Sequence, residues 1–169
     1  MRLLLLSSTL LILLTPALSA AEPQRLTVAD YFQKLPADVF EVPAPQLWRW
    51  LQQMKDAVVD IPNGYIQCEG DGAQGDFTVV LFRYKDGSPL LAICQGEPAE
   101  TDSWFLQFYK LGSSGRMEEV TRTIFPLPDE LRRKFELPRH GRTVVVRETK
   151  SGKVRSRFTW DGARFVKEK

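Results

Sequence analysis

Four arginines in the C-terminal quarter of the chain are the residues whose type and spacing best suit the binding of a ligand. They are Arg142, Arg155, Arg157 and Arg164. Guanidinium groups present forked donors that match carboxylate, sulfate and phosphate oxygens. The arginines predict a basic sheet face whose partner is an anionic glycan, a lipid head group or an acidic protein surface. The alternative is a solvated outer face, or one that acidic residues elsewhere in the chain neutralise.

The sequence offers no recognisable catalytic set. His140 is the single histidine, so a two-histidine zinc site is excluded. The Gly-x-Ser-x-Gly elbow and the phosphate-binding loop are both absent from the sequence. We therefore predict no catalytic residue, no metal and no cofactor.

An acidic, glycine-rich segment, residues 69–76, is the alternative candidate site. Carboxylates that alternate with glycines can wrap a hard cation such as calcium, but the spacing here departs from the EF-hand pattern. Asp71 and Asp76, with His140, would serve a small hydrolase if they converged in one cleft. The other interpretation is a flexible loop whose glycines supply positive φ.

Charge is distributed unevenly along the chain. Residues 22–129 carry 9 basic and 16 acidic side chains, whereas residues 130–169 carry 13 basic and 5 acidic ones. The formal net charge is only +2, and few aromatic residues alternate with the arginines, so a nucleic-acid partner is not expected. Without a catalytic set, the charge pattern predicts an exported, non-catalytic binding or inhibitory module. The alternative is a small extracytoplasmic hydrolase that uses the acidic loop.

Residues 1–21 have the features of a secretory signal peptide. Arg2 supplies a positive start, residues 3–14 form an apolar run, and small residues precede a cleavage point after Ser19 or Ala21. The apolar run is shorter than the ~20 residues that a membrane-spanning helix needs. We expect a periplasmic or secreted protein with no transmembrane segment after processing. An uncleaved N-terminal anchor is the alternative.

The chain has two cysteines, Cys68 and Cys94. An oxidising compartment favours one disulfide between them, and two buried thiols are the alternative. Geometry limits the bridge. If the strand that holds Cys68 pairs with residues 77–84, the two cysteines lie two strands apart, at ~9.5 Å, which is too far for a disulfide.

Residues 22–169 are predicted to form a single α+β domain that begins with two helices. Thr27 and Asp30 form a capping-box-like start for a short helix that ends before Pro36. A proline suits the first turn of a helix, and apolar residues recur at helical spacing over residues 45–58. The second helix is therefore expected to be amphipathic, with a heavy aromatic face.

From Tyr65 onward the apolar period changes to two, which predicts strands. The predicted strands span residues 65–69, 77–84, 90–95, 104–110, 116–123, 143–149, 154–160 and 163–167. Residues 129–135 are predicted to form one or two helical turns. The expected fold is α+β, with two N-terminal helices followed by a twisted antiparallel sheet of about seven or eight strands. A closed β-barrel and a pair of propeller-like blades are the alternatives.

The dipeptide Asp86-Gly87 predicts a two-residue hairpin loop. In that register Phe82 lies opposite Leu91, and both faces of the hairpin are apolar. Both faces should therefore be covered, one of them by the second helix.

The dipeptides Ser151-Gly152 and Asp161-Gly162 predict two more two-residue loops. In these registers Phe158 lies opposite both Val145 and Phe165. One face then carries Val145, Phe158, Trp160 and Phe165, and the other carries Val144, Val146, Glu148, Arg155, Arg157, Arg164 and Val166. Glu148 falls opposite Arg155, which predicts a stabilising cross-strand charge pair.

Overall fold

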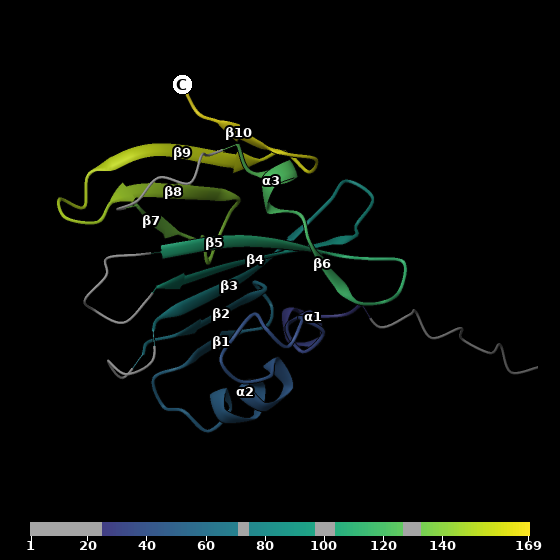
Figure 1. Ribbon diagram of the computed structural model, residues 1–169. Coiled ribbons are helices and arrows are strands. Elements are labelled where there is room, and N and C mark those ends of the chain that lie inside the picture. Colours follow the sequence, from purple (N-terminus) through teal and green to yellow (C-terminus); the bar gives the residue numbers. More distant parts are fainter. Residues whose placement is uncertain (1–24, 71–74, 97–103, 127–132) are drawn as a thin grey trace, which may run out of the picture.

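The computed structural model describes residues 25–70, 75–96, 104–126 and 133–169. Its strands form two antiparallel sheets, of six and four strands (Figure 1). The larger sheet lies in the middle, with short N-terminal helices against one face and the smaller sheet against the other. The predicted signal peptide, residues 1–21, lies outside the described residues.

The larger sheet is a meander in which each strand pairs with the next one along the chain. Its strands are β1 (Val58–Asp60), β2 (Tyr65–Cys68), β3 (Phe77–Arg83), β4 (Pro89–Gly96), β5 (Trp104–Leu111) and β6 (Met117–Glu119). The turn between β1 and β2 contains Gly64 at φ 65°, whose carbonyl accepts a 2.8 Å hydrogen bond from the Leu81 N–H. The turn therefore lies directly against β3.

The smaller sheet contains β7 (Arg133–Glu136), β8 (Thr143–Glu148), β9 (Val154–Trp160) and β10 (Phe165–Lys167), in the spatial order β10-β9-β8-β7. The prediction of one sheet of about seven or eight strands is thus wrong. The described strands form two open sheets, not a closed barrel. Two stacked sheets bury apolar faces that one open sheet would leave in water.

The chain leaves the larger sheet where we predicted a long strand over residues 116–123. The strand β6 stops at Glu119, and the short helix α3 (Thr121–Ile124) follows it. Phe125 then packs between the sheets, with its ring centroid 5.5 Å from that of Phe108 and 4.9 Å from that of Phe158. Residues 133–136 form β7 instead of part of the predicted helical turns.

The first helix, α1 (Val28–Phe32), begins at the predicted cap. The Asp30 carboxylate accepts a 2.7 Å hydrogen bond from the Thr27 N–H, and Thr27 Oγ1 accepts one from the Asp30 N–H. The second helix, α2 (Ala44–Leu51), is shorter than the predicted residues 45–58. Residues 52–57 form turns and irregular chain, and β1 begins at Val58, where two β-branched valines favour extended backbone.

The hairpin of β3 and β4 has a longer loop than predicted. It contains three residues, 85–87, with Gly87 at φ 83° in the left-handed conformation that such loops require. Phe82 therefore pairs with Leu90, not with Leu91. Both faces of the hairpin are covered as predicted, one by the helices and one by the smaller sheet, but α1 and not the second helix makes the main helical contacts with β3 and β4.

The pairing of β8 with β9 also differs from the predicted register. The connecting loop has four residues, 149–152, and β9 bulges at Arg155. Phe158 consequently lies opposite Val144 instead of Val145, and Val144 is fully buried while Val145 is half-buried. A shift of one residue exchanges the two faces of a strand.

The pairing of β9 with β10 is shifted by two positions, because the loop consists of residues 162–163. Phe165 therefore pairs with Trp160, not with Phe158. An even shift keeps each side chain on its predicted face. The three aromatic residues share the buried face, as predicted.

Two apolar cores result from this arrangement. The first core lies between the N-terminal helices and the larger sheet, and its fully buried members are Val28, Phe32, Ile66, Val79, Leu91 and Ile93. The second core lies between the two sheets, and its fully buried members are Leu90, Ala92, Phe108, Val144 and Val146. Trp160, with 1% of its surface exposed, also lies in the second core.

Cys68 and Cys94 are buried and no disulfide joins them, so the disulfide expectation is wrong and the alternative of two buried thiols holds. Strand β3 lies between them, since Cys68 pairs with Phe77 and Cys94 pairs with Thr78. Cys68 belongs to the first core and Cys94 to the second. The thiols therefore lie on opposite faces of the larger sheet.

Without any reductant, we expect iodoacetamide to alkylate two thiols per chain in denaturant. In the native protein at pH 8, Cys94 should stay unmodified. Its Sγ donates to the Phe135 carbonyl oxygen at 3.3 Å, and burial raises its pKa to about 12, so the reactive thiolate is nearly absent. Peptide mass spectrometry identifies the alkylated sites. A denatured chain that takes up no reagent would show that the cysteines are bridged.

Candidate anion-binding site

Three of the four arginines predicted from the sequence lie at exposed positions on or beside strands of the smaller sheet, and the fourth, Arg142, directly precedes β8. Arg157 and Arg164 are exposed, and strand alternation puts them on the outer face of the smaller sheet. Arg155, at the bulge, is also exposed, and its Nη2 lies 2.7 Å from Glu148 Oε1. The predicted charge pair is therefore present although the register differs.

Of the groups invoked for a hydrolase, Asp76 and the segment that holds His140 lie at opposite ends of β2. Asp76 directly precedes β3, at the C-terminal end of β2. At the other end of β2, Arg139, the neighbour of His140, places its Nε 2.8 Å from Asp60 Oδ2. The length of β2, about 10 Å, separates the two ends. Asp71 lies outside the described residues.

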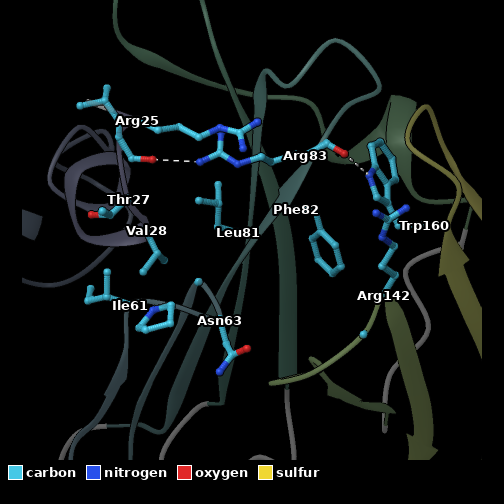
Figure 2. A pocket seen from close by; sticks show the side chains of 14 residues that line it. Arg25, Thr27, Val28, Ile61, Asn63, Leu81, Phe82, Arg83, Arg142 and Trp160 are labelled. Carbon is cyan, nitrogen blue, oxygen red and sulfur yellow. Dashed lines mark hydrogen bonds between the residues drawn. The ribbon is translucent and has the colours of Figure 1, made fainter. Parts of the chain in front are cut away.

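A cavity of about 360 Å³ opens where the N-terminal segment meets both sheets (Figure 2). Its walls come from residues 25–28, 61–64, 81–83, 141–142 and 160. The first range leads into α1, the second is the turn between β1 and β2, and the third ends β3. The cavity is thus built from segments that are far apart in the sequence, and it lies at the small end of the range for ligand pockets.

Two guanidinium groups reach the same turn beside the cavity. Arg83, at the end of β3, donates from Nη1 to the Gly87 carbonyl oxygen at 3.1 Å and from Nη2 to the Leu26 carbonyl oxygen at 2.9 Å. A Cβ atom built on Gly87 would lie 3.3 Å from Arg25 Nη2. Two positive groups so close to one turn repel each other, and an anion bound between them would relieve that repulsion.

The third cation, Arg142, directly precedes β8 of the smaller sheet. Its carbonyl oxygen accepts a 2.9 Å hydrogen bond from the Trp160 N–H, and its side chain extends toward Trp160 in Figure 2. The Trp160 indole Nε1 donates to the Arg83 carbonyl oxygen at 2.8 Å. One buried tryptophan therefore ties the strand of Arg83 to the segment of Arg142.

Within the described ranges, no carboxylate forms an ion pair with Arg25, Arg83 or Arg142. Asp30 and Asp86, which flank the lining segments in sequence, form hydrogen bonds with their own turns. These hydrogen bonds hold the pKa of each carboxyl group below its ordinary value, so both are ionised at neutral pH. The three guanidinium charges remain available to a ligand.

The capping box of α1 supports one wall of the cavity, and its contribution should depend on pH. Hydrogen bonds from the backbone and side chain of Thr27 lower the pKa of Asp30 from its ordinary value of 3.8. A lowered pKa in the folded state gives stability that is present above the unfolded pKa and is lost as the pH falls through the folded pKa. Asp30→Ala should therefore destabilise by about 1 kcal/mol at pH 7.

Urea denaturation of both proteins at pH 7 and below pH 3 measures this difference. The gap between Asp30→Ala and the parent protein should shrink in acid. A gap that stays constant across this range would show that the ionised carboxylate does not contribute.

The sequence pattern identified Arg142 but missed Arg25 and Arg83. Arg25 precedes the cap of α1 by two residues, and Arg83 ends a strand just before a turn. Each looks like an ordinary solvated residue when the sequence is taken alone. Only the contact of the N-terminal segment with the β3–β4 turn, through the Leu26 carbonyl oxygen, brings them together.

In the part of the chain that the structure describes, no three histidine, cysteine, aspartate or glutamate residues form a group that could hold a metal ion. None of the helices there has the length and apolar character needed to cross a membrane.

Comparison with protein families and with curated protein sequences finds no match. Among solved structures, the chain is similar to a domain of an uncharacterized protein from Porphyromonas gingivalis W83, with a TM-score of 0.59 and 12% sequence identity. The alignment covers 83% of this chain and 97% of that domain. The similarity extends over most of both chains and concerns the fold alone.

Proposed function

We propose that the protein is an exported, non-catalytic binding module that takes an anionic group in the cavity between Arg25, Arg83 and Arg142. The observation that carries the proposal is the approach of Arg25 and Arg83 to Gly87, with neither paired to a described carboxylate. A surface that collects positive charge without internal compensation favours a negatively charged ligand.

The geometry of Arg83 supports this role. A guanidinium group has five N–H donors, and two of those of Arg83 bind backbone carbonyls. Three donors remain, on a side chain that is already held in place. Because less side-chain entropy is lost on binding, a preorganised cation binds more tightly than a mobile one.

Export rests on residues 1–21, with their positive start, apolar run and small residues before Ala21. Mass spectrometry of the protein from its native host should show a chain that begins at Ala20 or Glu22. A chain that still begins at Met1 would contradict cleavage and export.

Titration with sodium phosphate at constant ionic strength, followed by amide NMR, tests the binding site. Shifts should concentrate at residues 25–28, 83–87 and 142. Arg142→Gln should weaken binding, because it removes one cation from the cavity wall. The double variant Arg157→Gln/Arg164→Gln has the same type of change on the outer face and should bind normally. Shifts confined to that outer face, and lost in the double variant, would place the anion on the sheet face instead.

A further inference from the structure

Apart from its guanidinium groups, the cavity offers few free side-chain hydrogen-bonding groups. Thr27 Oγ1 donates to Asp30 Oδ2 at 2.7 Å. Asn63 Nδ2 donates to the Asp60 carboxylate at 2.9 and 3.0 Å. The indole N–H of Trp160 is also engaged. The polar part of a ligand therefore meets N–H donors, which calls for an acceptor-only group such as a carboxylate or a phosphate.

Seven apolar residues also line the cavity. The apolar lining residues are Leu26, Val28, Ile61, Pro62, Leu81, Phe82 and Trp160. Leu26 is 39% exposed, and Ile61 and Leu81 are half-buried, so water covers part of this surface in the free protein. A purely polar anion would leave that surface wet, whereas an apolar group would displace the water favourably.

Two of the three guanidinium groups lie apart from most of the carbon surface of the cavity. Figure 2 shows the Arg25 and Arg83 guanidinium groups together at one side, with Leu81 next to them and Ile61 farther away, on the turn that also carries Asn63. Asn63 lies away from these guanidinium groups in the same view. A ligand with a charged end and an apolar end matches this division.

We propose, building on the binding function above, that the ligand is a compact amphiphilic anion. Its carboxylate or phosphate head binds Arg25 and Arg83, and its short hydrocarbon body lies on Ile61 and Leu81. The cavity of about 360 Å³ lies at the small end of the range for ligand pockets, which favours a compact body over a long one. A free alkyl or aryl acid and the end of a larger lipid share this chemistry.

A chain-length series tests the proposal. Acetate, butanoate, hexanoate and octanoate are titrated into the protein by calorimetry at constant ionic strength. Affinity should rise about fourfold per added methylene until the cavity is filled, as expected for burial of CH₂ groups. Hexyl phosphate should bind, and hexyltrimethylammonium should not. Vesicles that carry anionic lipids show whether the ligand belongs to a membrane. The protein should stay bound to the vesicles only if its ligand is part of a membrane lipid.

Two variants test separately how the charged head and the hydrocarbon body of the ligand contribute to binding. Leu81→Thr should reduce the gain per methylene while leaving acetate binding unchanged. Arg25→Gln should weaken every acid of the series by a similar factor of about tenfold. The matched controls are Leu111→Thr, the same change at a half-buried leucine of β5, and Arg49→Gln, the same change at an exposed arginine of α2. Both controls should bind like the parent protein.

The outcomes distinguish this inference from the proposed function. If acetate and octanoate bind with equal affinity, and Arg25→Gln weakens the binding of both, the proposal of an amphiphilic ligand is wrong and the anion site is supported. If no acid of the series depends on Arg25, the anion site itself fails. If Leu81→Thr does not fold, Ile61→Thr removes carbon surface from the same wall, in a turn, and gives the same readout.

Discussion

Replacing Trp160 with alanine is expected to lower the free energy of unfolding by about 3–5 kcal/mol. The side chain is 1% exposed. Its ring centroid lies 5.1 Å from those of Tyr84 and Phe165 and 6.4 Å from that of Phe82. Removing the ring leaves a cavity between two sheets that cannot close without moving one of them, so little of the lost packing is recovered.

Trp160→Phe separates packing from hydrogen bonding. It keeps a ring between the sheets but leaves the Arg83 carbonyl oxygen without its donor. An unpaired buried carbonyl costs about 1–3 kcal/mol, less than loss of the whole ring. Trp50→Ala is the matched control, because Trp50 is 36% exposed and its removal should cost little. Urea denaturation measures all three variants. Equal losses for Trp160→Ala and Trp50→Ala would mean that Trp160 does not join the sheets.

The second large effect is on binding. Arg83→Gln is expected to weaken phosphate binding by at least about tenfold, since a hydrogen bond to a charged group contributes about 1.5–3 kcal/mol. The substitution removes a guanidinium that two backbone carbonyls already orient. The titration that locates the site, followed by amide NMR, measures the change.

Arg83→Lys and Arg116→Gln are the comparisons for this variant. Lysine keeps the charge but loses the planar fork, so Arg83→Lys should bind with intermediate affinity. Arg116 is an exposed residue in the β5–β6 turn, outside the cavity lining, and its substitution should change nothing. Phosphate affinity in Arg83→Gln equal to that in Arg116→Gln would remove Arg83 from the site.

Short patterns in the sequence predict most of the secondary structure correctly. The hydrogen-bonding pair Thr27 and Asp30 specifies its own helix start, and the structure contains that capping box. Alternating apolar residues specify strands, and β2, β3, β4, β5, β8 and β9 lie close to the predicted positions. These features depend on neighbours within a few residues, so the sequence alone contains the information.

Register depends on loop length, which turn residues define poorly. The Asp86-Gly87 dipeptide fits a two-residue loop and also a three-residue loop whose last residue is left-handed. The structure has the longer loop, so each pair in the β3–β4 hairpin shifts by one residue. Between β8 and β9, the bulge at Arg155 shifts the register further, and the residues of the turn do not predict this bulge.

Patterns among neighbouring residues in the sequence could not predict the division into two sheets or the binding cavity. Both follow from contacts between distant segments, such as Phe125 between the sheets and Arg83 with the Leu26 carbonyl oxygen. The run of C-terminal arginines did point to Arg142. It placed Arg155, Arg157 and Arg164 on one face of the final sheet, with Arg142 near its end, and it gave no sign that Arg142 lines a cavity with Arg25 and Arg83.

The arginine side-chain NMR spectrum offers the most direct test that an anion binds between the two sheets and the N-terminal segment. Nε–Hε resonances, assigned by single Arg→Gln variants, are followed during addition of sodium phosphate at constant ionic strength. The signals of Arg25, Arg83 and Arg142 should shift together with one dissociation constant, while that of Arg157 stays fixed. Signals of all exposed arginines that drift equally, without saturation, would contradict a site in the cavity.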